Sequence, residues 1–163
     1  MKQSLLALLL VLVGACSSDS GPPPITALGD LEPYDGFGSA TLVVDGEQEW
    51  PVLVADTASL RSQGLMSVTD LGPWAGMVFV WEEPTDGGFW MKDTLIPLSI
   101  YWLDGDGAIV AIAEMVPCPP DEDDCPRWRP GVHYLTALEV PAGMGEQLGI
   151  DSNSILTLRE GLP

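Results

Sequence analysis

Residues 40–55, ATLVVDGEQEWPVLVA, decide the fold that this sequence predicts. Two runs rich in β-branched and aromatic residues, Ala40–Val44 and Trp50–Ala55, stand on either side of the dipeptide Asp45-Gly46. Asp-Gly between two such runs is a strong β-hairpin signal, because both residues tolerate the positive φ angles of a tight turn. The chain is therefore expected to form a hairpin here.

The residues after this hairpin, DTASLRSQGLM, predict a helix of about two turns. Asp56 or Thr57 can cap its start, and Gly64 can end it in a left-handed conformation. Leu65 would then fold back on Leu60, which is the apolar contact expected of this kind of helix end.

Short strands are predicted along the rest of the chain. Their spacing is too short for repeated βαβ crossovers, so a parallel sheet is not expected. The predicted fold is mostly β, a compact antiparallel barrel or sandwich with one or two short helices. The further strands are expected at Gly76–Trp81, Phe89–Met91, Leu98–Leu103, Ala108–Val116, Tyr134–Val140 and Ile155–Arg159, with a second short helix within residues 141–149.

The N-terminal sequence, MKQSLLALLLVLVGAC, has the form of a secretory signal that ends in a bacterial lipobox. Residues 1–15 are expected to be removed, leaving a lipidated Cys16 at the start of a tether that reaches residue 39. Residues 40–163 have the length of one domain. The predicted location is the cell envelope, outside the cytoplasm, with the lipid as membrane anchor. An ordinary signal peptide with an incidental cysteine is the alternative.

The chain is strongly acidic, with 24 Asp and Glu against 6 Lys and Arg and a formal net charge of −18. Such a surface repels phosphate backbones, so nucleic acid is not expected as a partner.

Two cysteines, Cys118 and Cys125, bracket a short acidic loop at residues 119–124. In an exported protein, two cysteines this close are expected to form a disulfide. A redox pair usually has Cys-x-x-Cys spacing, and His or Cys partners for a metal are missing. The loop itself is expected to be solvated, and loose binding of a cation by its four acids is the alternative.

Two other motifs do not indicate a cofactor or a metal. The first is Asp104-Gly-Asp-Gly, which looks like part of a calcium-binding loop. Such a loop needs an oxygen ligand at its first position and a glutamate at its twelfth, and here these positions are Trp102 and Ala113. A hairpin turn is therefore expected instead. His133 is the single histidine, and the chain has no Gly-x-Ser-x-Gly nucleophile motif. His133 is therefore interpreted as a residue at a strand end.

Several blocks of sequence form a recognisable pattern, namely Val54-Ala-Asp-Thr-x-x-x-Arg61-x-x-Gly64-Leu-Met66, Gly76-Met-Val-Phe79, Phe89-Trp-Met-Lys-Asp-Thr-Leu-Ile-Pro97-Leu-x-Ile100, Tyr134 and Leu138-Glu-Val-Pro-Ala-Gly143. Together these blocks resemble family 192 of the domains of unknown function. The Phe-Trp-Met-Lys block is the most specific of them, and the resemblance covers nearly all of residues 40–160. It implies a compact, mostly antiparallel β domain with a small helix after the second strand, and no established activity, cofactor or substrate.

The chain departs from the family pattern at three polar positions. Asp93 stands where the family usually has Asn, Ser99 where it often has Asp, and Val68 where it often has Arg. A site built from all three polar groups would be chemically altered here, which argues against catalysis.

The candidate site residues are Arg61, Trp90, Lys92, Asp93, Thr94 and His133. In one interpretation, Arg61 and Lys92 bond to acids or backbone carbonyls and clamp the helix to the sheet. In the other, they hold a carboxylate or a sugar acid, because arginine supplies a rigid fork of donors and Trp90 a flat apolar face. The structural interpretation is the one favoured for Lys92.

The sequence thus favours a non-catalytic, lipid-anchored domain that binds a small ligand or an envelope component. One alternative is a hydrolase or lyase acting on an envelope or extracellular polymer, with Lys92, Asp93 or His133 as acid–base groups. The other is a structural envelope protein without a pocket. A concave pocket shared by Arg61, Lys92 and Asp93 would favour the first two.

Overall fold

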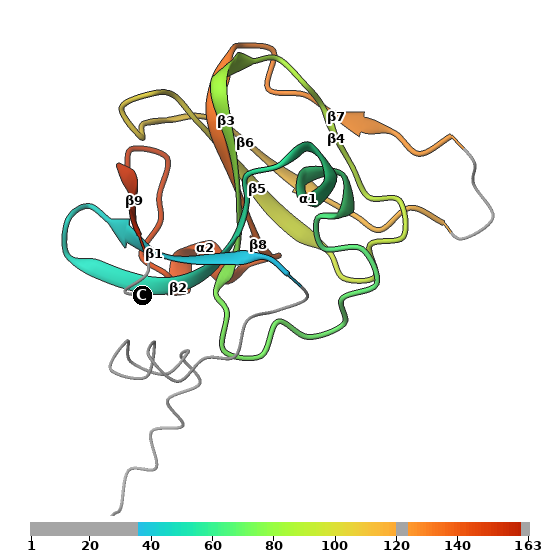
Figure 1. Cartoon of the computed structure of the whole chain (residues 1–163), viewed down its shortest axis with the longest axis horizontal. Helices are drawn as coiled ribbons and strands as arrows, with labels where there is room; N and C mark the ends of the chain where they lie inside the picture. The colour runs from blue at the N-terminus through green and yellow to red at the C-terminus, as the bar shows by residue number, and fades with distance from the viewer. Residues whose placement is uncertain (1–35, 120–123, 161–163) are drawn as a thin grey trace, which may run out of the picture.

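The computed structural model describes residues 36–119 and 124–160. The predicted signal peptide, Cys16, the tether up to residue 35 and residues 120–123 of the acidic loop lie outside this part of the chain. The described part forms nine strands and two short helices (Figure 1). They are β1 (Gly38–Val44), β2 (Gln48–Ala55), α1 (Ala58–Gln63), β3 (Gly76–Thr85), β4 (Phe89–Trp90), β5 (Leu98–Leu103), β6 (Ile109–Met115), β7 (Arg127–Trp128), β8 (Tyr134–Pro141), α2 (Met144–Gln147) and β9 (Leu156–Glu160).

Seven of the strands form one curled sheet in the order β6-β5-β8-β3-β2-β1-β9 (Figure 1). The remaining two, β4 and β7, pair with each other in a small second sheet. The prediction of a mostly β domain with two short helices is confirmed. β7 was not among the predicted strands, because two residues are too few to show a periodic pattern.

The first hairpin forms where the sequence predicted it. β1 and β2 pair antiparallel up to Val44 and Gln48. Asp45 and Gly46 have φ angles of 52° and 74°, as the tight turn between right-twisted strands requires. The Asp104-Gly-Asp-Gly motif likewise forms the turn between β5 and β6, and the Asp104 side chain accepts hydrogen bonds from the backbone N–H groups of Asp106 and Ala108, both at 2.9 Å.

The helix α1 is capped by Thr57 and not by Asp56. The Thr57 hydroxyl accepts a hydrogen bond from the backbone N–H of Leu60 at 3.2 Å. Gly64 ends the helix with a φ angle of 46°, and its N–H donates to the Leu60 carbonyl oxygen at 2.8 Å. These local signals fix the position of α1 between β2 and β3.

One strand pair departs from the antiparallel pattern. β2 and β3 run parallel, with Val52 opposite Gly76 and Ala55 opposite Phe79. A parallel pair needs a crossover of about a dozen residues, and residues 56–75, which include α1, are long enough for one. The sequence argument excluded repeated crossovers, which is correct, but it overlooked this single one.

The core lies on both faces of the sheet. Along β5, Leu98, Ile100 and Trp102 belong to one buried cluster, and Tyr101 and Leu103 belong to another. All six residues of β5 are buried. A strand that is covered on both faces typically has a nearly continuous apolar sequence. The first cluster also includes residues that follow α1, and Leu60 of the helix and Trp128 of β7 pack against it. α1 and the β4–β7 pair therefore cover the same side of the sheet.

The predicted disulfide is present. Cys118 and Cys125 are bonded, with their Cα atoms 5.7 Å apart. The bond joins the segment after β6 to the segment before β7, and so holds β7 close to the sheet. Arg127, on β7, is thereby placed opposite Trp90 on β4.

Candidate functional site

An open cavity of about 370 Å³, which we call the Trp90 cleft, is lined by residues of α1, β3 and the β4–β7 pair. In Figure 1, α1 lies in front of the sheet, near the strands labelled β4 and β7. Aromatic rings and two guanidinium groups line most of it. The lining residues are Ala58, Arg61, Ser62, Phe79, Trp81, Thr85, Gly87, Gly88, Phe89, Trp90, Arg127 and Tyr134.

Arg61 reaches the cleft from α1 in a fixed orientation. Its Nη1 donates to the backbone carbonyl oxygens of Val80, at 2.8 Å, and of Asp56. Its guanidinium carbon lies 5.1 Å from the ring centroid of Trp81, within cation–π range. Arg61 therefore joins the helix to β3 with one nitrogen, and leaves its other donors free of hydrogen bonds to the described residues.

Two further cationic side chains lie over the ring of Trp90. The guanidinium carbon of Arg127 lies 4.4 Å from the ring centroid, and the Lys92 Nζ lies 5.9 Å from it. Trp90 is also more exposed than the other large aromatic residues of the described part, at 36%. This combination gives the cleft a flat apolar wall with positive charge beside it.

Basic residues are concentrated around the cleft. Five of the six basic residues of the chain are in the described part, and four of these lie in or beside the cleft. Arg61 and Arg127 line it, Lys92 stacks on Trp90, and Arg129 lies against Gly88 and donates to the Asp86 carbonyl oxygen at 3.1 Å. The fifth, Arg159, pairs with Glu49 in the one salt bridge among the described residues. None of the four cations at the cleft forms a salt bridge with a carboxylate of the described residues.

Phe89 is the centre of the aromatic wall. Its ring makes edge contacts with Phe79 and Trp81, at centroid distances of 5.0 and 6.1 Å. Tyr134 closes the wall, and its hydroxyl donates to the Gly87 carbonyl oxygen at 2.8 Å. Burial, followed by the nearby Asp86 carboxylate, raises the pKa of Tyr134 to about 12. Tyr134 therefore stays neutral and adds no negative charge to the cleft.

Glu139 is a buried acid close to this cleft. It is 4% exposed, and its neighbours across the sheet are Met77 on β3 and Ile100 on β5. The loss of water raises the pKa of Glu139 to about 8. Glu139 belongs to one of the sequence blocks that resemble the family, but it was not among the predicted site residues. Its position inside an apolar strand, Tyr134–Val140, was the available signal.

Comparison with known proteins now assigns the family. The sequence matches DUF192, described as an uncharacterized ACR, over residues 40–158. The chain belongs to the DUF192 family. The resemblance proposed from the sequence is thereby confirmed, and a comparison with curated proteins gives no match.

Two solved structures resemble this DUF192 domain. A protein of unknown function from Novosphingobium aromaticivorans is 28% identical with a TM-score of 0.67, and the match covers 78% of this chain and 90% of that one. A candidate transcription regulator from Sinorhizobium meliloti 1021 is 26% identical with a TM-score of 0.62, and the match covers 78% of this chain and 98% of that one.

The Lys92 turn lies at the edge of the DUF192 cleft. The N–H of Thr94 donates to the Met91 carbonyl oxygen at 3.2 Å, which closes a turn in which Asp93 has a φ angle of 54°. Asn and Asp tolerate this left-handed conformation better than most residues, so Asp93 suits its position in the turn. The Lys92 ammonium has no acid or carbonyl partner among residues 36–119 and 124–160.

The candidate residues are only partly brought together. Arg61 and Trp90 line the cleft, Lys92 contacts it through Trp90, and Asp93 is exposed in the turn. Thr94 is buried and its hydroxyl approaches the Lys92 carbonyl oxygen at 3.4 Å. Val68 and Ser99, two of the departures from the family pattern, are buried and do not line the cleft.

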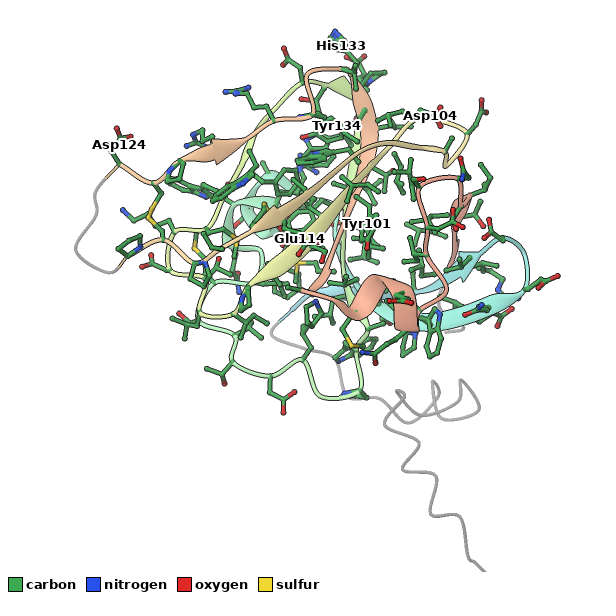
Figure 2. The ribbon with its side chains drawn as sticks, turned by 180° about the vertical axis from the view of Figure 1, so that it is seen from behind. Tyr101, Asp104, Glu114, Asp124, His133 and Tyr134 are labelled. Carbon is green, nitrogen blue, oxygen red and sulfur yellow. A yellow bond between two sulfur atoms is a disulfide. The ribbon has the colours of Figure 1, made fainter. Side chains whose placement is uncertain are left out.

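His133 lies outside the Trp90 cleft. Figure 2 shows it at the outer edge of the molecule, whereas Tyr134 points inward. It lines a separate surface hollow with Asp86 and Arg129.

No group of three or more His, Cys, Asp or Glu side chains in the described ranges could hold a metal ion. Neither helix there is long and apolar enough to cross a membrane.

Proposed function

We propose that this DUF192 domain binds a small organic anion in the Trp90 cleft, outside the cytoplasm, while a lipid on Cys16 tethers it to a membrane. The observation that carries the binding proposal is the gathering of Arg61, Lys92, Arg127 and Arg129 around one aromatic cleft. The chain has a net charge of −18. If its few cations served only solubility or ion pairing, they would lie among the acidic residues and not around one cleft.

The chemistry of the lining indicates the kind of ligand. Arginine donors bind carboxylates and related anions through paired hydrogen bonds, and the flat faces of Trp81 and Trp90 suit a planar ring or the apolar face of a sugar. The Arg61 side chain is already held by Val80, so little conformational entropy is lost when a ligand binds. A small anion with a ring or sugar body satisfies all of these features.

Binding is better supported than catalysis. The described residues that line the Trp90 cleft include no Asp, Glu or His. The acid–base groups suggested for a hydrolase or lyase are separated, since Asp93 is exposed in its turn and His133 lies in another hollow. A purely structural role does not account for Lys92 and Arg127, which lie over the exposed Trp90 ring and have no salt bridge among the described residues.

The membrane tether rests on the sequence of residues 1–16. A short basic start, an apolar run and a cysteine after Gly14-Ala15 are the pattern of a lipobox. Each buried lipid methylene contributes roughly 0.8 kcal/mol, so two or more acyl chains on Cys16 would hold the protein stably on its membrane.

Tryptophan fluorescence of the full-length chain tests the binding proposal. Benzoate and glucuronate should change the emission in a saturable way, while benzamide and glucose should not. Arg127→Ala should weaken binding roughly tenfold, the cost of about one hydrogen bond to a charged group. Arg159→Ala is the matched control, because it removes the same charge from another exposed strand residue. Equal effects of the two substitutions would refute the cleft as the binding site.

A further inference from the structure

A second, much smaller cavity shares lining residues with the Trp90 cleft, and we call it the inner cavity. Its volume is about 30 Å³. Arg61, Phe89 and Trp90 line both cavities, so the two are adjacent. Thr94 and Glu139 line the inner cavity only.

Glu139 makes no hydrogen bond or ion pair to the described residues, and its carboxyl group keeps some accessible surface, because the fully enclosed side-chain atom without a partner there is Trp102 Nε1 and not a Glu139 oxygen. Its side chain is on the same face of the sheet as Met77 and Phe79, and Met77 lies directly opposite it. A buried carboxyl group without a partner is costly, and most buried polar groups in proteins are paired. Such a group at the wall of a cavity is therefore a candidate for contact with a bound molecule.

The charges facing Glu139 are few. Of the described residues that line the inner cavity, Arg61 on α1 is the other charged one. The neighbouring strands contribute Met77 from β3 and Ile100 from β5, and the segment before β5 contributes the hydroxyl of Thr94. Glu139 therefore keeps its proton at neutral pH, with a pKa of about 8, and a neutral carboxyl group can donate one hydrogen bond.

We propose that the inner cavity is the head-group subsite of the Trp90 cleft, that it accepts a carboxylate, and that Glu139 donates a hydrogen bond to it while Arg61 supplies the positive charge. This inference rests on the proposed function and names the class of its ligand. The body of the ligand lies in the larger cleft against Trp90, and its carboxylate enters between Arg61 and Glu139.

The size of the inner cavity selects a carboxylate over a phosphate. A water-sized group needs roughly 10–15 Å³ by this measure, so about two such groups fit in 30 Å³. A carboxylate has two oxygens, whereas a phosphate monoester has three terminal oxygens and up to two negative charges. One guanidinium and one neutral donor also match a single charge better than a double one.

Titration of full-length protein with benzoate and with phenyl phosphate, followed by tryptophan fluorescence, tests this subsite. At pH 6 benzoate should bind at least tenfold more tightly than phenyl phosphate. At pH 9 about one Glu139 in eleven keeps its proton, so benzoate affinity should fall by about tenfold. This part of the test needs no variant.

The variant Glu139→Gln keeps a hydrogen-bond donor at position 139 but removes the proton that Glu139 loses at high pH. The glutamine amide still donates but does not titrate, so benzoate affinity at pH 6 should remain and should change less than twofold up to pH 9. Thermal melting at pH 6 confirms that the variant is folded. A loss of benzoate affinity between pH 6 and pH 9 in Glu139→Gln that equals the loss in the wild type, or phenyl phosphate binding as tightly as benzoate, would overturn the subsite. Benzoate binding that needs Arg127 but ignores Glu139 would overturn the subsite alone, whereas binding of neither probe would overturn the proposed function as well.

Discussion

Arg61 and Glu139 line the same inner cavity, yet they form no salt bridge within 4.0 Å in the described chain. Arg61 instead donates to the Val80 carbonyl oxygen at 2.8 Å. The guanidinium charge therefore remains available, and the carboxyl group remains uncharged in an apolar setting. The inner cavity is therefore lined by a cation and by a neutral proton donor.

The first prediction concerns the pH dependence of stability. The pKa of Glu139 is about 8 in the folded protein against an ordinary value of 4.5, so only the folded state holds this proton between those values. The stabilisation is complete below about pH 4.5 and is lost as the pH rises through about 8. The slope is roughly 1.4 kcal/mol per pH unit at most.

Thermal melting of wild type and Glu139→Gln from pH 5 to pH 9 measures this effect. The wild type should lose several degrees relative to the variant between pH 5 and pH 8. Glu114→Gln, which removes an exposed carboxylate from β6, is the control and should run parallel to the wild type. A difference between wild type and Glu139→Gln that does not vary with pH would contradict the burial of a protonated Glu139.

The second prediction concerns Arg61 as the link between α1 and β3. Arg61→Met keeps much of the apolar stem but leaves the half-buried Val80 carbonyl without its donor. The free energy of unfolding should fall by about 1–2 kcal/mol in urea denaturation. Arg159→Met breaks an exposed ion pair and should cost less than about 1 kcal/mol. Equal losses in the two variants would show that Arg61 does not join helix and sheet.

The third prediction concerns Lys92. Its ammonium contacts the Trp90 ring at 5.9 Å and has no acid or carbonyl partner in the described residues. Lys92→Met should therefore change the free energy of unfolding by less than about 1 kcal/mol, the value of an exposed cation–π contact. If Lys92 were a structural clamp, its substitution would lower the free energy of unfolding by more than this, but a clamp needs an acid or carbonyl partner for the ammonium. A fall of several degrees in melting temperature would restore the clamp interpretation.

Much of the fold could be predicted because its signals are local. Asp45-Gly46 between two β-branched runs specifies the first hairpin, and Thr57 and Gly64 mark the ends of α1. The parallel pairing of β2 and β3 could not be read in this way, because it depends on how residues 56–75 cross the sheet.

The candidate site was only partly predictable, for the same reason. Arg61 and Trp90 belong to recognisable blocks, and both line the cleft. Arg127 follows Trp90 by more than thirty residues and reaches it only through the β4–β7 pair and the nearby disulfide. Glu139 gave no sign of a neighbouring cavity, since that cavity exists only where α1, the Thr94 segment and β8 meet.

The fourth prediction concerns the membrane tether. Cys16→Ser removes the predicted attachment point of the lipid and leaves the domain sequence intact. After cell fractionation the variant should move from the membrane to the soluble extracytoplasmic fraction, and its melting curve should match that of the wild type. Unchanged membrane association of Cys16→Ser would contradict the lipoprotein interpretation.

The most direct measurement of the central claim follows the indole N–H signals of the six tryptophans by NMR during a benzoate titration. Trp→Phe variants assign the signals. The indole signals of Trp81 and Trp90, which line the cleft, should shift in a saturable way and with one affinity. Trp50 donates to the Leu148 carbonyl oxygen at 3.1 Å in the other core cluster, so its signal should not move. A titration that leaves Trp81 and Trp90 unshifted, or that shifts Trp50 equally, would contradict an anion-binding site in the Trp90 cleft.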